Sequence, residues 1–445
     1  MACVMLRPFA RGGPALATMT FFADLMSTLF ERGPFRPSRK PYDMEAIGPE
    51  IEELLSGVGE VSGVRLARDI LSQYQSMDAP AKKAFFQHLA DKLDLDPDHV
   101  IDAAEAYRTE RNASTLRRLT RAAEPRRQEL LRRLNQAPGA TDWLVRMRED
   151  LLRMLPDSPE LDVVDADFQH LFASWFNRGF LVLRRIDWHT PANILEKIIE
   201  YEAVHAINDW QDLRRRVLPS DRRCFAFFHP AMPEEPLIFV EVALCKGIPN
   251  SIQTLLDDGH PTLPEHEADT AVFYSISNCQ EGLKGISFGN LLIKQVVEEL
   301  ASEVPGLKTF VTLSPVPGFN RWLAAQAPER PDIESLLARL EAREPEAVNE
   351  NSAFLQSLCA EYLVGARGKN GRPVDPVARF HLGNGALLHD IHALADKSAN
   401  GWDQSSTVMV NYLYDLKQVS RNSERFMSSG EVLTSKQVRQ LLPRG

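Results

Sequence analysis

The chain has 445 residues and a formal net charge of −10, from 61 acidic side chains against 51 Lys and Arg. At about 100–200 residues per domain, its length predicts two or three domains. Its 44% hydrophobic and 25% charged residues exclude the disordered and fibrous classes. The acidic balance argues against a dedicated nucleic-acid-binding protein, because phosphate neutralisation needs a cationic surface.

The N-terminal segment from Met1 to Phe22 contains Arg7 and Arg11, and the first acidic residue is Asp24. This composition loosely matches a transit peptide, but the segment is short and poor in serine. We expect residues 1–20 to be a disordered leader of a cytoplasmic protein, and a location in the mitochondrial matrix is the alternative. No run of about 18 apolar residues occurs, so we expect no transmembrane span and no membrane partner.

From residue 49 to about residue 170, apolar residues recur at intervals of three and four, which is the period of an amphipathic helix. Helix stop-and-start signals such as Asp96-Pro97-Asp98 separate the segments. The pattern predicts a helical bundle over roughly residues 20–170. The expected helical segments are 49–77, with a break near Gly57–Gly63, then 79–95, 98–119 and one that begins at Pro125.

Nine arginines lie between Arg108 and Arg133. One hypothesis is a binding site for a polyanion. The alternative is a solvated helix face, because four interleaved glutamates offer ion-pair partners three or four residues away. We favour the solvated face. The glutamates are Glu105, Glu110, Glu124 and Glu129.

After residue 172 the pattern changes to alternating strands and helices. Pro191 opens a helix that is expected to reach Ile207, and an apolar helix is expected over residues 290–300. An acid-rich stretch over residues 327–351 predicts an inserted helix or helical hairpin. This part of the chain is therefore predicted to be an α/β (α+β) domain. Its expected strands are 180–186, 223–228, 237–244, 271–277 and 309–313.

Five cysteines are scattered along the chain, and no pair has the C-x-x-C spacing of a zinc or redox site. Three of them lie in or beside apolar strand-like runs, where a thiol packs as a small hydrophobic group. We expect reduced structural cysteines and no disulfide framework. They are Cys3, Cys224, Cys245, Cys279 and Cys359.

Residues 273–290 read as a strand, a glycine-rich loop and the start of a helix. Glycines let backbone N–H groups approach a phosphate closely, and a helix N-terminus adds a partial positive charge. Lys284 adds a full charge beside Gly282, Gly285 and Gly289, which predicts a pyrophosphate cradle. The alternative is a tight turn that binds nothing. The spacing matches neither a P-loop nor a Rossmann fingerprint.

Ser314 follows another expected strand, on a loop stiffened by Pro315 and by Pro317-Gly318. Ligands of open α/β sheets bind at this carboxyl end of the strands. The alternative interpretation is a plain turn. Ser314 itself does not stand in a G-x-S-x-G elbow, which argues against a hydrolase nucleophile of that type at this position.

His381 lies just before the turn signal Asn384-Gly385. His389 and His392 follow at metal-ligand spacing, but the sequence has no H-E-x-x-H pattern and no third ligand at a recognised distance. We therefore expect no metal. A lone histidine is more often structural than catalytic, so His381 carries no assignment by itself.

Several runs of sequence, in register along most of residues 172–420, resemble the malonyl-CoA decarboxylase family. The resemblance implies a helical oligomerisation domain at residues 21–172. It also implies a catalytic domain at residues 173–445, with a fold similar to the acyl-CoA N-acyltransferases, the GNAT fold. The runs that carry it are 229–237, 274–289, 313–319, 380–386 and 409–414.

The resemblance also assigns residues. The family's catalytic serine and histidine correspond to Ser314 and His381, and Ser275 and Tyr414 match positions expected to face the acyl group. Where the acyltransferase loop begins with Gln or Arg, this chain has Lys284, and Ser287 replaces the first glycine. That departure argues against amine acetylation. The family's substrate loop corresponds to Lys284, Gly285, Ile286, Ser287, Phe288, Gly289 and Asn290.

The implied reaction is the decarboxylation of malonyl-CoA to acetyl-CoA and CO2 in fatty-acid or malonate metabolism. The thioester itself accepts the electrons, so no cofactor is implied. Ser314 would contact the malonyl group and take part in proton transfer, and His381, with a pKa near the working pH, would protonate the carbanion. The alternatives are an acyl-CoA N-acyltransferase and a non-enzymatic acyl-CoA sensor. Further copies of the chain, in a tetramer or a dimer, are the expected protein partners.

Overall fold

The structure is a computed structural model that describes residues 44–57, 59–257, 259, 261–286 and 292–442. The chain divides into two compact units, the first ending at Asp167 and the second beginning at Phe168. This division lies inside helix α9 (Asp162–Trp175), and the boundary predicted after residue 172 falls in the same helix. The predicted leader, residues 1–20, is outside the described residues.

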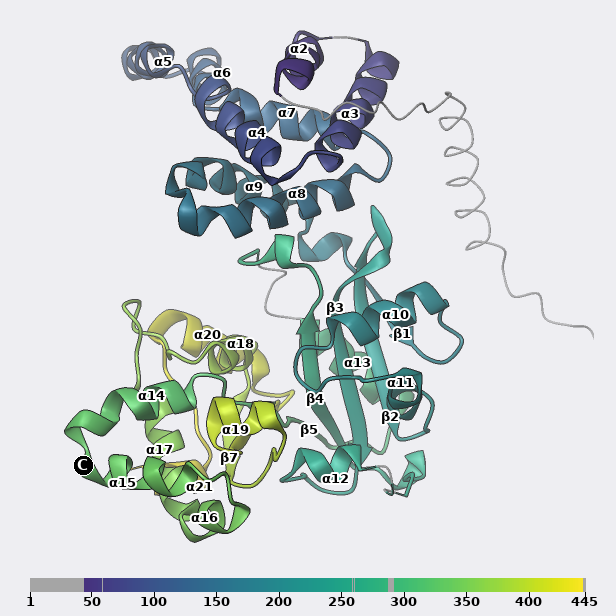
Figure 1. Cartoon of the computed structure of the whole chain (residues 1–445), viewed down its shortest axis with the longest axis vertical. Helices are drawn as coiled ribbons and strands as arrows, with labels where there is room; N and C mark the ends of the chain where they lie inside the picture. The colour runs from purple at the N-terminus through teal and green to yellow at the C-terminus, as the bar shows by residue number, and fades with distance from the viewer. Residues whose placement is uncertain (1–43, 58, 258, 260, 287–291, 443–445) are drawn as a thin grey trace, which may run out of the picture. The chain divides into compact units, whose positions relative to one another are not determined.

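The described part of the first unit is built from helices, which confirms the predicted helical domain (Figure 1). The carboxylates of Asp78 and Asp96 begin two of them by accepting backbone amide hydrogen bonds ahead of proline-containing first turns. The rings of Tyr74, Phe85 and Phe86 pack edge to face in the core of this unit. The helices before α9 are α2 (Met44–Leu55), α3 (Glu60–Gln75), α4 (Ala79–Lys92), α5 (Pro97–Thr109), α6 (Ala113–Ala122), α7 (Arg126–Leu134), α8 (Ala140–Met154), η1 (Leu155–Asp157) and η2 (Pro159–Leu161).

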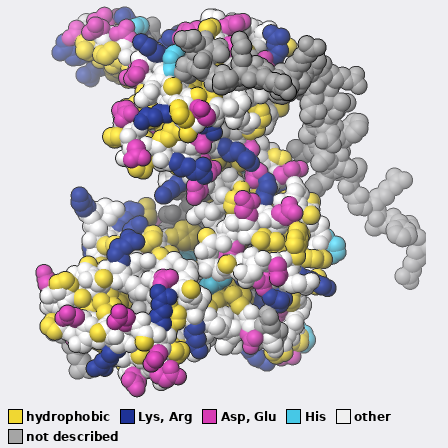
Figure 2. Space-filling model, viewed as in Figure 1, with side chains coloured by type: hydrophobic (Ala, Val, Ile, Leu, Met, Phe, Trp, Pro, Cys, Tyr) yellow, Lys and Arg dark blue, Asp and Glu magenta, His cyan; other side chains and the backbone are white. Residues whose placement is uncertain are grey.

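The arginine-rich stretch is partly surface and partly interior. Arg117 and Arg118 on α6 are exposed, and Figure 2 shows basic and acidic side chains intermingled over α5 and α6, at the upper left of the view. Arg127 is buried instead, where it pairs with Asp94 at 2.6 Å and with Asp167. The favoured interpretation, a solvated face, therefore describes α6 and does not describe Arg127.

The second unit contains an eight-stranded sheet with helices around it, which confirms the predicted mixed class. The strand order is β1-β2-β3-β4-β5-β8-β6, and β7 pairs with β8. β4 and β5 run parallel and are joined through helix α13 (Leu292–Glu303), while the other pairs are antiparallel. The strands are β1 (Val182–Ile186), β2 (Arg222–His229), β3 (Met232–Cys245), β4 (Thr270–Asn278), β5 (Thr309–Thr312), β6 (Ser314–Pro315), β7 (Leu387–His392) and β8 (Met409–Leu413).

Helices α10 (Ala192–Tyr201) and α11 (Trp210–Val217) pack on β2 and β3 through a buried apolar cluster that includes Ile198, Leu213 and Phe239. The helix predicted to reach Ile207 ends at Tyr201. It ends there because the next carboxylate, Glu202, accepts the amide hydrogens of residues 204 and 205. That turn places the Glu202 carboxylate against β4, where it contacts the hydroxyl of Ser275.

The remaining helices are short, and most follow β5 in the chain. Two of them, α15 and α16, fall in the stretch predicted as an inserted helical hairpin. α18 carries His381. The elements are η3 (Arg178–Phe180), α12 (Ile252–Leu256), η4 (Glu265–Glu267), η5 (Glu281–Leu283), α14 (Phe319–Gln326), η6 (Ala327–Glu329), α15 (Pro331–Leu340), α16 (Pro345–Glu350), α17 (Ser352–Gly365), α18 (Pro376–Gly383), α19 (Ala399–Ser405), α20 (Val419–Ser429) and α21 (Lys436–Leu441).

The two parallel strands diverge at their carboxyl ends. β4 and β5 stay in register as far as Phe273 and Thr312. Tyr274 comes next in β4 and has no partner in the β3–β4 register, so it forms a bulge. The chain after β5 turns away through β6, whose Ser314 pairs with Val410 of β8. Both diverging segments line the cavity described below.

The four cysteines in the described part of the chain are free thiols, as predicted, and Cys3 lies outside that part. Burial raises the pKa of the Cys224, Cys279 and Cys359 thiols, so these side chains are packing groups rather than nucleophiles. None of the helices in the described residues is both long enough and apolar enough to cross a bilayer.

Candidate active site

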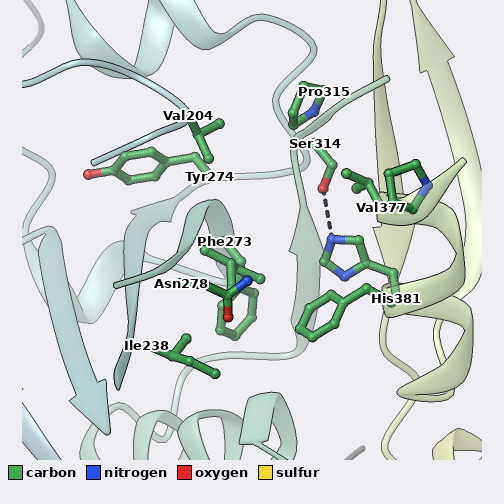
Figure 3. Close-up of a pocket in the computed structure, with 12 residues that line it drawn as sticks. Val204, Ile238, Phe273, Tyr274, Asn278, Ser314, Pro315, Val377 and His381 are labelled. Atoms are coloured by element: carbon green, nitrogen blue, oxygen red, sulfur yellow. Dashed lines mark hydrogen bonds between the residues drawn. The ribbon is translucent and has the colours of Figure 1, made fainter. Parts of the chain in front are cut away.

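A cavity of about 240 Å³ lies where β4 diverges from β6 (Figure 3). The polar side chains among its described lining residues are Tyr274, Asn278, Ser314 and His381, and none of the described lining residues is Lys, Arg, Asp or Glu. A carboxylate in this cavity would therefore lie against a mostly apolar wall. The apolar lining residues are Val204, Ile238, Phe273, Ile276, Pro315, Pro376, Val377 and Phe380.

Ser314 reaches the cavity from the two-residue strand β6, as the sequence predicted for the end of a strand. Its side chain is only 5% exposed. The Ser314 Oγ–H donates to Thr312 Oγ1 at 2.8 Å, and Thr312 Oγ1 also accepts the backbone N–H of Tyr412 at 3.1 Å. Two hydrogen bonds to the same threonine oxygen thus hold Ser314 and β8 together.

His381 comes from α18, on the opposite side of the cavity from β4, and faces Ser314 (Figure 3). Its Nε2 lies 3.1 Å from Ser314 Oγ, and its Nδ1 lies 2.8 Å from the Tyr414 hydroxyl. The ring of Tyr412 stacks on the imidazole, with the centroids 4.7 Å apart and the planes 24° apart. Hydrogen bonds at both nitrogens and a stacked ring fix the imidazole.

The hydrogen bonds around this pair run in one direction. Because Ser314 donates its hydroxyl hydrogen to Thr312, its oxygen is left to accept a hydrogen from His381 Nε2. A neutral imidazole with its hydrogen on Nε2 has an acceptor at Nδ1, which receives the hydroxyl hydrogen of Tyr414. The donors therefore follow one another from Tyr414 through His381 and Ser314 to Thr312.

Burial lowers the pKa of His381 to about 3. The sequence-based expectation of a pKa near the working pH is therefore wrong for this structure, because the imidazole is removed from water with no carboxylate to stabilise its charged form. Burial also keeps the pKa of the Tyr414 hydroxyl well above its ordinary value. At neutral pH both groups are uncharged hydrogen-bond donors.

Tyr414 lies just beyond β8 and is not among the residues that line the cavity. Its position is set by its backbone N–H, which bonds the Phe310 carbonyl at 2.9 Å. The sequence predicted a contact with the acyl group. The structure places the hydroxyl behind His381 instead, in contact with the imidazole.

Ser275 is not brought to the cavity. Its neighbours Phe273, Tyr274 and Ile276 line the cavity, and Ser275 is not among the lining residues. The Ser275 hydroxyl contacts both carboxylate oxygens of Glu202, at 2.8 and 2.7 Å. In this structure Ser275 anchors the turn after α10.

The predicted phosphate loop is described only in part. Lys284, Gly285 and Ile286 follow η5, while Ser287, Phe288, Gly289 and Asn290 lie outside the described residues. Lys284 is exposed, and Gly285 has a φ of +82°, a conformation that favours glycine. Among the described residues other than its two chain neighbours, no heavy atom lies within 4 Å of a Cβ built at Gly285, so the positive φ is what favours glycine there.

The described residues contain no group of three or more His, Cys, Asp or Glu side chains that could hold a metal ion. His392 of the hypothetical metal pair bonds the Asn411 side chain through Nε2 at 2.5 Å. Asn411 in turn donates to the backbone carbonyl of Thr312 at 2.7 Å. His392 thus belongs to the packing of β7 against β8 and β5.

Sequence reasoning missed three residues that hold the pair in place: Thr312, Tyr412 and Asp375. Asp375 begins α18 by accepting the Ala378 N–H at 2.8 Å. The Asp-Pro pair at 375–376 is a helix-start signal that could have placed it. Thr312 and Tyr412 come together through pairing between strands distant in sequence, which no local pattern reveals.

Comparison with known families shows matches along most of the chain. The family described as "Malonyl-CoA decarboxylase C-terminal domain" matches residues 179–445. The family described as "Malonyl-CoA decarboxylase N-terminal domain" matches residues 93–176. The two matches follow the division between the mixed and the helical parts of the chain.

Individual proteins agree with these family matches. The chain is 37% identical over 360 residues to the mitochondrial malonyl-CoA decarboxylase of Mus musculus, covering 73% of each chain. The crystal structure of malonyl-CoA decarboxylase from Rhodopseudomonas palustris superposes with a TM-score of 0.85 at 51% identity, over 90% of this chain and all of that one. The Agrobacterium vitis structure gives a TM-score of 0.85 at 49% identity, over 89% of this chain and all of that one.

Proposed function

Since this chain belongs to the malonyl-CoA decarboxylase family, we propose that it converts malonyl-CoA to acetyl-CoA and CO2 at the cavity beside Ser314 and His381. The observation that carries this placement is the hydrogen-bonded pair of buried side chains at the wall of an apolar cavity. The chemistry can be followed from the substrate's own charges.

Decarboxylation breaks the bond between the carboxylate and the α-carbon of the malonyl group. The electron pair of that bond moves into the thioester carbonyl and forms an enolate, and CO2 leaves. One proton then adds to the α-carbon to give acetyl-CoA. The thioester is the electron sink, so the protein must orient the carboxylate, stabilise the enolate oxygen and supply one proton.

The apolar wall favours the first step. A carboxylate moved from water into a cavity whose described lining residues carry no cation loses hydration that nothing replaces. The charge in the enolate is spread over the thioester, and CO2 is neutral. The transition state therefore loses less hydration free energy in the cavity than the bound carboxylate does. The cavity thus destabilises the bound carboxylate relative to the products.

Ser314 and His381 have different roles in binding the malonyl group and in protonating the α-carbon. Ser314 contacts the malonyl group, with its hydroxyl held by Thr312. His381 delivers a hydrogen from Nε2 to the α-carbon as Nδ1 takes the hydroxyl hydrogen of Tyr414, and one proton from water restores the Tyr414 hydroxyl before the next turnover. A neutral imidazole is a sufficient acid here, because the α-carbanion of a thioester is far more basic than an imidazole nitrogen.

The experiment that tests this function uses the purified full-length protein and malonyl-CoA alone. We expect acetyl-CoA and CO2 to form in equal amounts with no added amine or cofactor. The result against the proposal is release of free CoA that depends on an amine and yields no CO2. That result would identify an acyl-CoA N-acyltransferase.

We also propose that the helical unit joins copies of the chain, as a tetramer or a dimer. Large apolar side chains of that unit are exposed, among them Val61 at 78% and Ile101 at 58%. Light scattering of the purified protein would measure the assembly. We propose a cytoplasmic location in fatty-acid or malonate metabolism, with the mitochondrial matrix as the alternative, since the Mus musculus relative is named as mitochondrial.

A further inference from the structure

The proposed catalytic pair comes from two segments that are separate in the chain. Ser314 stands at the head of a short loop that runs through Pro315 and Pro317 to Gly318, and His381 stands on α18. The 3.1 Å contact between their side chains joins positions 67 residues apart. Some interaction besides this contact must hold the two segments in place when substrate enters between them.

One buried carboxylate touches both segments. Asp375 is 1% exposed and stands immediately before α18. Its Oδ1 accepts the Ala378 N–H at 2.8 Å, and the Val377 amide also faces the carboxylate. These contacts determine where α18 begins, and six residues later the helix presents His381.

The other side of the same carboxylate faces the serine segment. The Tyr362 hydroxyl donates to Oδ2 at 3.4 Å, and the backbone amide of Gly318 faces the same carboxylate. The packing there leaves no spare room. A Cβ built on Gly318 would lie 2.3 Å from the Tyr362 hydroxyl oxygen and 4.0 Å from Asp375 Oδ2.

We propose that Asp375 is a positioning residue that sets the distance between Ser314 and His381, because its carboxylate caps α18 and also accepts the Tyr362 hydroxyl that packs against Gly318. This inference rests on the proposed roles of Ser314 and His381. The segment between Asp375 and His381 is stiff because it is less than two turns of helix. The segment between Gly318 and Ser314 is stiff because it contains two prolines. A shift of the carboxylate is therefore transmitted to both catalytic side chains.

The test replaces Asp375 with serine. Serine keeps an oxygen that can cap α18, but it lacks the second oxygen that faces Gly318 and Tyr362. We expect Asp375→Ser to lower kcat by roughly 10–100-fold, because small misplacements of reacting groups cost about that much. KM for malonyl-CoA and the affinity for free CoA should stay within about threefold, since Asp375 does not line the cavity.

The matched control is Asp209→Ser. Asp209 caps α11 by accepting the amides of Gln211 and Asp212, both at 2.8 Å, and it is exposed. It makes the same kind of cap, on another helix of the same unit, without a second segment to hold. Its serine variant should keep wild-type kcat.

A second variant covers the case in which Asp375→Ser does not fold. Gly318→Ala leaves the carboxylate in place and pushes the serine segment away from Tyr362. We expect it to lower kcat with CoA affinity retained, and adding Tyr362→Phe should restore part of the rate by removing the obstructing oxygen. Wild-type kcat in folded Asp375→Ser or in Gly318→Ala would overturn the proposal.

Two further variants keep this outcome separate from a failure of the proposed function. Ser314→Ala and His381→Asn are assayed beside the others. If both turn over malonyl-CoA at the wild-type rate, the proposed site itself is wrong. If both lose turnover while the Asp375 and Gly318 variants keep it, the site stands and the positioning role of Asp375 is wrong.

Discussion

Burial decides what His381 can do as an acid. A histidine in water gains a proton below about pH 6.5, and the buried imidazole does so only near pH 3. It is held between Ser314 and Tyr414 by hydrogen bonds at both nitrogens. At neutral pH the residue therefore acts as a neutral link between two hydroxyl groups and not as an imidazolium ion.

The first prediction concerns the removal of that link. His381→Asn should lower kcat by about 10²–10⁴-fold, equivalent to roughly 3–5.5 kcal/mol of barrier, with a small change in KM. Asparagine can still accept and donate hydrogen bonds, but its amide does not pass on a proton as an imidazole does. Steady-state kinetics of the folded variant measure the effect, and near-normal turnover would remove His381 from the mechanism.

The second prediction concerns pH. The folded pKa of His381, about 3, lies below the unfolded value, so between roughly pH 6.5 and pH 3 the unfolded chain binds a proton that the folded protein does not. The stabilising contribution is complete above pH 6.5 and is lost as the pH falls. The free energy of unfolding of the wild type, measured by chemical denaturation, should therefore fall more steeply from pH 7 to pH 4 than that of His381→Asn.

A direct measurement of the same property is the NMR titration of histidine-labelled protein. The His381 signal, identified by its absence in His381→Asn, should not shift between pH 8 and pH 5. A midpoint near pH 6.5 would show a solvated imidazole and contradict the buried geometry.

The third prediction concerns Tyr414. Tyr414→Phe removes the hydrogen that Nδ1 receives, so kcat should fall roughly tenfold or more while KM changes little. Tyr412→Phe is the matched comparison, because its hydroxyl has no hydrogen-bond partner among the described residues and its ring stack would remain. It should lose less activity than Tyr414→Phe, and the reverse order would contradict the assigned hydrogen-bond direction.

The elements that can be tested separately from catalysis are β4 and the loop that follows it. The sequence predicts a phosphate cradle there, and the described part ends at Ile286. Gly285 has a positive φ, and no described residue beyond its chain neighbours comes within 4 Å of a Cβ built there. A side chain at this position would therefore act by altering the backbone and not by striking a neighbour.

The fourth prediction follows from that geometry. Gly285→Val should weaken CoA binding, because a β-branched residue disfavours a φ of +82° and would reorient the backbone amides of the loop. Lys284→Ala should weaken it less, and added salt should shrink the Lys284 effect because it is partly one of charge. Calorimetric titration with CoA measures both, and an unchanged affinity in Gly285→Val would rule out the cradle.

The elements that sequence predicts well are those that carry their own signals. Five strands and the N-terminal helices follow from apolar periodicity and capping residues, and β1 to β5 match the predicted strands. β7 and β8 were not predicted, because their pairing with each other and with β5 and β6 is what makes them strands. The chain enters β8 through Ser406 and Thr407, both at positive φ. The sequence does not predict this conformation, because neither residue is the glycine that usually marks it.

The candidate site shows the same limit. Ser314 and His381 could be named from the sequence because a resemblance in several runs supplied them. Their burial, their hydrogen-bond direction and the low pKa of His381 depend on Thr312, Asp375 and residues 412 and 414, which only the folded chain brings together. Ser275 was expected to face the acyl group, and its hydroxyl contacts the Glu202 carboxylate instead.

At the scale of the whole molecule, the proposed binding and catalytic residues lie in different parts of the second unit. The loop after β4 is proposed to hold the CoA phosphates, and the pair at β6 and α18 is proposed to act on the malonyl group. The two functions should therefore separate in variants. This separation is the central prediction, and CO2 release without an added amine distinguishes it from an acyltransferase or a non-catalytic sensor.

The measurement that tests it most directly is turnover of malonyl-CoA by Ser314→Ala, with the affinity for free CoA and acetyl-CoA measured on the same preparation. We expect kcat to fall about 10²–10³-fold, since the lost hydroxyl acts as charge moves from the carboxylate to the thioester oxygen. Affinity for CoA and acetyl-CoA should be nearly unchanged, because neither carries a malonyl carboxylate. Wild-type turnover in folded Ser314→Ala, or an equal loss of CoA affinity and turnover, would contradict the account.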